Sequence, residues 1–192
     1  MLKVSALADG KEVAYDPVAA FTRQLTHRGT DARIVVTMPA GRADLLREIS
    51  ALFPGPYQVL YVLHSPRGEG EAGRYQSGEV NRADLEEFLK RFEPFLLKDA
   101  RCDLWVHPAH GDGLVVWDRH HELFVYGQTE RVITRLNELG IFEGPHMMIG
   151  EHLHHFRSEC DDDAADILKA LPWVRSDLQP GDHQYVITDD EE

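Results

Sequence analysis

Runs of apolar residues bounded by turn residues predict strands along most of the chain. LKVSALA and KEVAY flank Asp9-Gly10, and Asp-Gly supplies the positive backbone dihedral angles that a two-residue hairpin turn requires. ARIVVTM (32–38) and YQVLYVLH (57–64) are apolar enough to be buried strands. CDLWVH, GLVVWD and ELFVYG follow one another with turn residues between them, which is typical of an antiparallel meander.

The segments between these strands predict five helices, at about 17–28, 42–52, 81–93, 129–139 and 161–171. They have start and stop signals, such as Pro17 at a first helical position, Asn81 as an N-cap, and Pro94 and Gly140 as ends. Residues 65–80 are rich in glycine and lack a hydrophobic pattern, so we expect a long loop. Loops of this length are uncommon in compact domains and are usually functional or mobile. The pattern predicts a single α+β domain with a mixed, largely antiparallel sheet, about five helices packed on it, and a frayed acidic tail at 187–192.

The balance of charge restricts the partners. The 192 residues include 20 basic and 33 acidic side chains, for a formal net charge of −13 at pH 7. This charge repels nucleic acids and anionic membranes, so we expect neither as a partner, whereas a basic protein is compatible. The start of the chain lacks the apolar core of a signal peptide, and no apolar run is long enough to span a bilayer. Two cysteines without a C-x-x-C pairing fit a reducing compartment, so the sequence predicts a cytoplasmic protein.

Two motif matches fail on their context. Residues 68–73 match the dinucleotide pattern G-x-G-x-x-G, but the helix that should contain the third glycine begins only at Asn81. Residues 162–166 match the D-D-x-x-D pattern of terpenoid synthases, and acidic residues in a first helical turn are explained by the helix dipole. No complete catalytic constellation is found, so the sequence assigns no catalytic residue.

Histidines concentrate in GPHMMIGEHLHHFRSEC, residues 144–160. A strand there puts His152 and His154 on one face, whereas a helix brings His152 and His155 together, and either gives two imidazoles at the spacing of metal ligands. A third ligand from a neighbouring turn is His146, Glu159 or Cys160, and the preferred set is His146, His152 and His154. These three residues are the candidate zinc ligands. Two local ligands do not make a tetrahedral site, so the alternative is an imidazole cluster without a cofactor, whose members repel one another when charged.

Aromatic and charged residues of the meander and the long loop form a second candidate site. Tryptophan, tyrosine and arginine concentrate binding energy when an interface desolvates them. The turn after Trp117 is expected to start with Asp118, whose side chain bonds to the backbone. The candidate binding residues are Arg74, Tyr75, Trp117, Asp118, His120 and Tyr126. The alternative for each is a core aromatic residue or a polar hairpin tip.

Three stretches resemble a pattern in small uncharacterised bacterial proteins of the polymorphic-toxin immunity type. They are GRYQS (73–77), KDARCDLWVH (98–107) and VVWDRHHELFVYG (115–127). The resemblance covers about residues 55–145 and leaves out the histidine-rich segment. It implies a cytoplasmic, acidic protein without catalytic residues that binds and blocks a toxin domain.

Two functions are compatible with these features. The first is a soluble binding protein without catalytic activity, an inhibitor or immunity-type partner of a basic protein, whose acidic surface raises the association rate. The alternative is a metal-dependent hydrolase in which the 146–155 histidine cluster holds zinc and Asp118 or Glu151 is the general base for a bound water. The sequence leaves the partner, the substrate and the oligomeric state open.

Overall fold

The computed structural model describes residues 2–25, 32–39, 41–146 and 149–182. Within these ranges the large sheet has nine strands in the order β10, β3, β4, β9, β8, β7, β5, β6 and β12. They are β3 (Ala20–Leu25), β4 (Ala32–Thr37), β5 (Tyr57–Leu63), β6 (Gly73–Gln76), β7 (Cys102–Pro108), β8 (Leu114–Trp117), β9 (Glu122–Tyr126), β10 (Phe142–Glu143) and β12 (Val174–Ser176). Every neighbouring pair is antiparallel except β10 with β3. The predicted meander is confirmed as β7, β8 and β9.

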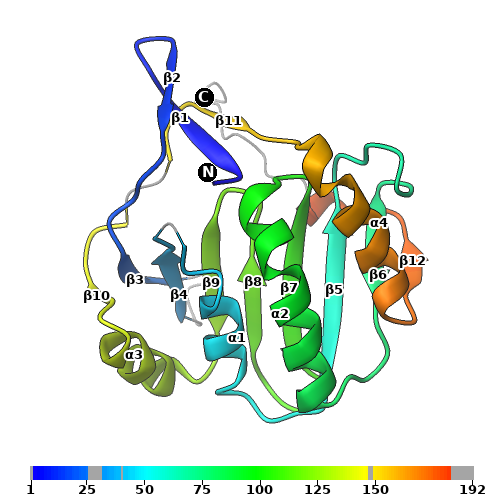
Figure 1. The fold of residues 1–192 in the computed structure, drawn as a ribbon. Coiled ribbons are helices and arrows are strands. Elements are labelled where there is room, and N and C mark those ends of the chain that lie inside the picture. The colour runs from blue at the N-terminus through cyan, green and yellow to red at the C-terminus, as the bar shows by residue number, and fades with distance from the viewer. Residues whose placement is uncertain (1, 26–31, 40, 147–148, 183–192) are drawn as a thin grey trace, which may run out of the picture.

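A second, three-stranded sheet is formed by β1 (Val4–Ala8), β2 (Lys11–Ala14) and β11 (His152–His154). Strand β1 pairs with both others, antiparallel in each case. The predicted hairpin turn is confirmed, because Asp9 and Gly10 have φ values of 51° and 70°. Figure 1 shows this small sheet above the upper ends of β8 and β9.

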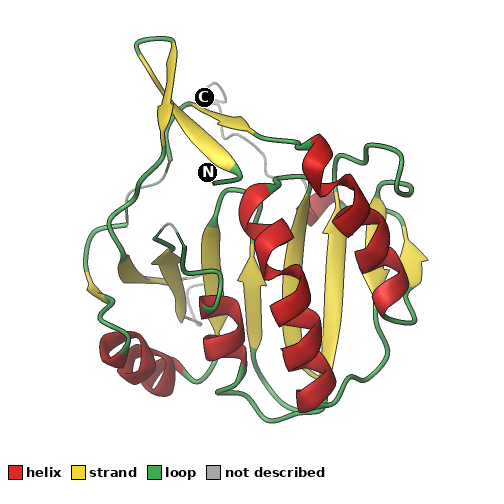
Figure 2. Cartoon of the chain, viewed as in Figure 1, coloured by secondary structure: helices red, strands yellow, loops and turns green. Residues whose placement is uncertain are grey.

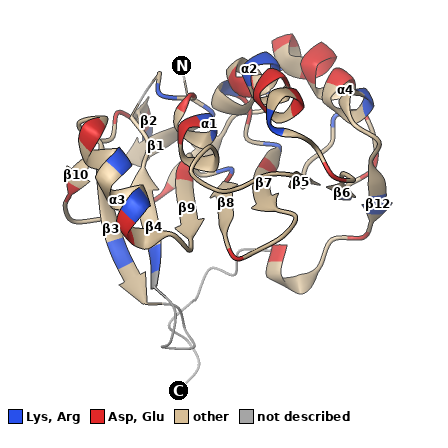
Figure 3. Cartoon of the chain, turned by 90° about the horizontal axis from the view of Figure 1, so that it is seen from below, with Lys and Arg blue, Asp and Glu red and all other residues tan. Residues whose placement is uncertain are grey.

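Helices cover one face of the large sheet (Figures 1 and 2). They are α1 (Leu45–Ser50), α2 (Arg82–Lys98), α3 (Thr129–Glu138) and α4 (Asp161–Ala170), with short 3₁₀ helices at Ser158–Cys160 and Pro180–Asp182. The view from below separates the helical layer from the sheet (Figure 3). In the part of the chain that the structure describes, no helix has both the length and the apolar character that crossing a bilayer requires.

The core lies between this helical layer and the sheet. Alternate residues of β5, such as Tyr57 and Tyr61, face the helices and are fully buried, as the two-residue period of a strand requires. From α2 the apolar stripe Leu85, Phe88, Leu89 and Phe92 packs against them. Burial of each large apolar side chain contributes about 1.5–3 kcal/mol. The mixed α+β fold class expected from the sequence is confirmed.

The helix predicted at 17–28 is wrong where the structure describes it. Residues 20–25 form strand β3, in which Phe21 is 2% exposed while Leu25 is 75% exposed. The backbone groups of β3 bond to β4, with Phe21 opposite Val36. Pairing with the sheet therefore outweighs the cap-like signal of Asp16-Pro17. Residues 26–28 lie outside the described ranges, as does the predicted tail at 187–192.

Two other predicted boundaries are wrong. Helix α2 continues through Pro94 to Lys98, because Phe95 and Leu96 extend its buried face and are only 1% and 2% exposed. The segment 65–80 is not loop throughout, since β6 lies within it and pairs with β5 and β12.

Arg101 ties the long loop to the rest of the fold. Its side chain is fully buried and donates to Asp99 at 2.8 Å, to Glu69 in the loop at 3.0 Å and to Asp161 at the start of α4 at 2.9 Å. Multiple hydrogen bonds are what make a buried charge tolerable, because an unpaired one costs several kcal/mol. This network gives the loop a structural role.

Candidate metal centre

The turn between β8 and β9 is organised by Asp118. Its Oδ1 accepts backbone N–H groups of His120 at 3.0 Å and Glu122 at 2.9 Å, as expected for an aspartate that begins a turn. His121, inside the turn, has a φ of 70°, in the left-handed region that few residues other than glycine adopt. This geometry directs the His120 side chain toward the small sheet, where its ring contacts those of His152 and His154.

Strand β11 supplies two further imidazoles. His152 and His154 are two residues apart and therefore share one face of the strand, as the sequence predicted. Their positions are set by pairing with β1, in which His154 lies opposite Val4 and His152 opposite Ala6. His155 lies on the other face, 3.4 Å from Glu12.

The three imidazoles converge. One ligand atom from each of His120, His152 and His154 lies within 4.8 Å of the others. The ring centroids are 4.8–5.1 Å apart. A tetrahedral zinc ion, with bonds of about 2.0–2.1 Å, holds its nitrogens about 3.4 Å apart, so small side-chain rotations would close this cluster on an ion. We refer to these residues as the histidine trio.

The hydrogen bonds of the trio leave the Nε2 atoms for coordination. His120 Nδ1 lies 3.0 Å from Asp118 Oδ2, and His152 Nδ1 lies 2.7 Å from the Gly150 carbonyl oxygen. An N–H donated from Nδ1 to such an acceptor leaves the Nε2 lone pair free, which is the usual arrangement of metal-bound histidine. The Nε2 of His154 is buried and has no hydrogen-bond partner.

The surroundings favour a neutral His154 and a charged Asp118. Burial, together with the neighbouring His120, His152 and Arg119, lowers the pKa of His154 to about 3. Burial alone would raise the pKa of Asp118, but the hydrogen bond and charge of His120 and the charge of Lys3 hold it below its ordinary value. Lys3, which is 1% exposed, has its ammonium 4.6 Å from the centroid of the Trp117 ring. A carboxylate is therefore held next to His120, and His154 offers a neutral imidazole.

A second histidine–carboxylate pair lies close by. His146 Nε2 is 2.7 Å from Glu122 Oε1, and both side chains are at most 10% exposed. Burial and the charge of Asp118 raise the pKa of Glu122, against the lowering effect of His146. Burial, Glu122 and Asp118 together raise the pKa of Tyr15 to about 12, so the phenol stays neutral. These groups form a buried polar layer next to the trio.

The structure brings together two of the three histidines predicted as ligands. His152 and His154 belong to the trio, whereas His146 is paired with Glu122 and has Gln24 3.4 Å from its Nδ1. His120, which the sequence placed among the binding residues, takes the third position. The sequence signal for it is Asp118 two residues earlier, because a carboxylate that orients an imidazole is typical of a metal ligand.

The six predicted binding residues do not form one patch. Trp117 and Tyr75 belong to the hydrophobic core, at 1% and 9% exposed, and Asp118 is 3% exposed. Arg74 pairs with Asp182 and lies over the ring of Trp105, and Tyr126 accepts from Arg33. Of the six, Asp118 and His120 are the pair that the histidine site contains.

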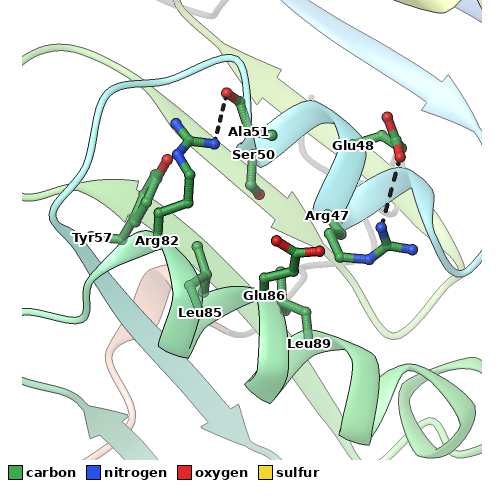
Figure 4. Close-up of a pocket in the computed structure, with 9 residues that line it drawn as sticks. All are labelled: Arg47, Glu48, Ser50, Ala51, Tyr57, Arg82, Leu85, Glu86 and Leu89. Atoms are coloured by element: carbon green, nitrogen blue, oxygen red, sulfur yellow. Dashed lines mark hydrogen bonds and ion pairs between the residues drawn. The ribbon is translucent and has the colours of Figure 1, made fainter.

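A cleft between α1 and α2 is a weaker candidate (Figure 4). Its volume of about 160 Å³ is small against the roughly 300–1,000 Å³ of typical ligand pockets. Its cations already have partners, since Arg47 pairs with Glu93 at 3.1 Å and Arg82 donates to the carbonyl oxygens of Ala51 and Phe53. The charged groups that a ligand would use are therefore already engaged.

No protein family, curated protein or solved structure is found to match this chain. The resemblance to immunity-type proteins thus remains a prediction.

Proposed function

We propose that this protein binds one transition-metal ion, with zinc the best match, on the histidine trio, and that the ion activates a water molecule for hydrolysis. The observation that carries the proposal is the convergence of three imidazoles, two from strand β11 and one from the β8–β9 turn, with ligand atoms within 4.8 Å of one another.

The chemistry of the ligands supports a metal. Imidazole nitrogens suit zinc, copper, nickel and iron, and a tetrahedral nitrogen set favours zinc among them. Asp118 and the Gly150 carbonyl oxygen are the outer partners that orient metal-bound histidines. Without an ion, the buried Nε2 of His154 has no partner, and an unsatisfied buried polar atom costs about 1–3 kcal/mol.

The number of ligands supports catalysis. Structural zinc sites use four protein ligands, whereas catalytic sites use three and leave the fourth position to water. The trio supplies three, and a bound ion lowers the pKa of its water to near 7. We assign Glu122, hydrogen-bonded to His146, as the group that accepts the water's proton, and we assign Asp118 to the orientation of His120. Glu151, the other base considered from the sequence, is exposed.

Metal binding is tested by titrating zinc into untagged protein after treatment with a chelator. Wild-type protein is expected to bind one equivalent, and His120→Ala, His152→Ala and His154→Ala are each expected to lose tight binding. His110→Ala is the matched control, because this imidazole is 74% exposed and outside the trio. His146→Ala is expected to retain zinc. Absence of stoichiometric zinc in the wild type, or unchanged affinity in the trio variants, would overturn the proposal.

Hydrolysis is tested by comparing zinc-loaded and metal-free protein on p-nitrophenyl acetate and p-nitrophenyl phosphate. Turnover that requires zinc, and that falls in Glu122→Gln while zinc stays bound, supports the assigned proton acceptor. Zinc binding with no turnover on either ester would restrict the role of the ion to structure.

A protein-binding function is a second proposal, supported by the distribution of charge. Glu86 and Glu87 of α2 and Asp162 and Asp163 of α4 are exposed, and Figure 3 shows acidic residues along both helices. An immunity-type protein would use such a surface to attract a basic partner, with an association rate that falls as salt is added. The test is co-purification from the native host at low and high salt, with Glu86→Lys/Glu87→Lys expected to lose the partner and keep the zinc.

A further inference from the structure

Arg119 is a half-buried cation whose guanidinium has no partner among the described residues. Among the described residues, Arg119 and Arg131 are the arginines whose side chains neither donate a hydrogen bond nor form an ion pair, and Arg131 is exposed on α3. Buried and half-buried arginines elsewhere are engaged, as Arg74 is with Asp182 and Arg101 is with Asp99. An unpaired guanidinium is unexpected in a chain with 33 acidic and 20 basic residues.

The backbone of Arg119 is fixed beside the trio. Its N–H donates to Asp103 Oδ1 at 2.8 Å, and Asp103 Oδ2 lies 3.0 Å from His64 Nε2, so the turn is anchored to β7. The next residue is His120 of the trio. The positive charge of Arg119 also contributes to the lowered pKa of His154 in β11.

An aromatic side chain lies beside His154. Phe156 follows β11, is 40% exposed, and its ring centroid lies 6.4 Å from that of His154. The trio therefore has a cation in the residue before His120 and an aromatic ring beside His154.

We infer that Arg119 binds an oxyanion, a carboxylate or a phosphate group, of a ligand that occupies the open position on the metal. The inference rests on the proposed metal site and names the class of ligand. The planar guanidinium presents parallel N–H donors that match the two oxygens of a carboxylate or phosphate, and a metal ion next to it adds a second positive charge. Among the described residues the Arg119 guanidinium makes no hydrogen bond or ion pair, so its N–H donors remain for a ligand.

The test uses cobalt(II)-loaded protein, because the visible spectrum of the cobalt reports a change in its ligands. Inorganic phosphate and acetate are titrated separately into wild type, Arg119→Ala, Arg119→Lys and the control Arg131→Ala. Charge-assisted hydrogen bonds of this kind support at least about a tenfold loss of affinity for the preferred anion in Arg119→Ala. Arg119→Lys keeps the charge but loses the paired N–H donors of the guanidinium, so its anion affinity is expected to lie between those of wild type and Arg119→Ala. Arg131→Ala is expected to bind the anions as wild type does.

The two titrations separate this inference from the metal site. Cobalt that binds with wild-type affinity in Arg119→Ala, with weakened anion binding, supports the inference, and the tighter of the two anions identifies the ligand class. Equal anion affinity in wild type and Arg119→Ala, or no anion binding to the loaded wild type, overturns it and leaves the metal site standing. Failure of the wild type to bind cobalt removes both.

Discussion

Replacing Asp118 with asparagine tests whether the carboxylate behind His120 orients that imidazole for a metal. Oδ1 of Asp118 accepts two backbone N–H groups, whereas Oδ2 lies 3.0 Å from His120 Nδ1. Asparagine keeps one oxygen, so the turn retains its backbone hydrogen bonds. Its NH₂ group replaces the oxygen that faces His120, so two donors meet and the imidazole loses its preferred tautomer.

The magnitude follows from the role of the lost oxygen. Removing an outer partner of a metal-bound histidine costs about 10–100-fold in metal affinity. This corresponds to about 1.4–2.7 kcal/mol. The charge of Lys3 also loses a compensating carboxylate, so the metal-free variant is expected to unfold at a lower temperature than wild type. Affinity must therefore be measured well below that temperature.

The assay is competition for zinc with a chromophoric chelator. Glu151→Gln is the matched control, because it removes an exposed carboxylate next to His152. We expect Asp118→Asn to bind zinc about 10–100-fold more weakly than wild type, and the control to bind it about as tightly as wild type. Wild-type zinc affinity in folded Asp118→Asn would refute the orienting role of Asp118.

Three further predictions concern the fold. Arg101→Met is expected to lower the free energy of unfolding by about 3–5 kcal/mol in urea denaturation, because it leaves Asp99 buried without its cation, and a loss under about 1 kcal/mol would contradict this. Burial lowers the pKa of His121 to about 3, so the unfolded chain takes up a proton that the folded one does not. The free energy of unfolding should therefore fall as the pH drops from about 6.5 toward about 3. Asparagine tolerates a positive φ, so His121→Asn should fold and should show a smaller pH dependence in chemical denaturation over this range. Gly113→Ala should destabilise by at least about 1–3 kcal/mol, because φ is 147° and the added Cβ would lie 2.4 Å from Phe53 Cε1, whereas Gly78→Ala, with open space around it, should unfold as wild type does.

The sequence predicted best the elements whose own residues carry a clear strand or helix period. Strand β5 is an almost continuous apolar run, and the stripe on α2 repeats with helical period, so both were found from their own residues. Strand β3 was missed because its apolar residues are few, and the partner that makes it a strand, β4, is known only from the fold. Pro94 was taken as a helix end because the burial of Phe95 and Leu96 is a tertiary effect that a local signal does not contain.

In the candidate site too, some residues could be placed from local spacing and others could not. The two-residue period of a strand was enough to place His152 and His154 on one face, but His120 approaches them only because β11 pairs with β1 above the β8–β9 turn. His146 lies near in sequence and belongs to a different pair, with Glu122. Sequence spacing identifies ligands within one strand, whereas ligands that come from another sheet depend on docking between elements.

The pairing of β1 with β11 has a consequence for the order of assembly. Val4 is opposite His154, so the two strands meet only after synthesis has passed almost the whole chain between them. Contacts of such long sequence separation form late, because they must first overcome the entropy of closing the loop. The meander and helices α1 to α3 precede β11 in the chain and can fold before then, so the proposed metal is expected to bind last, as the step that completes maturation.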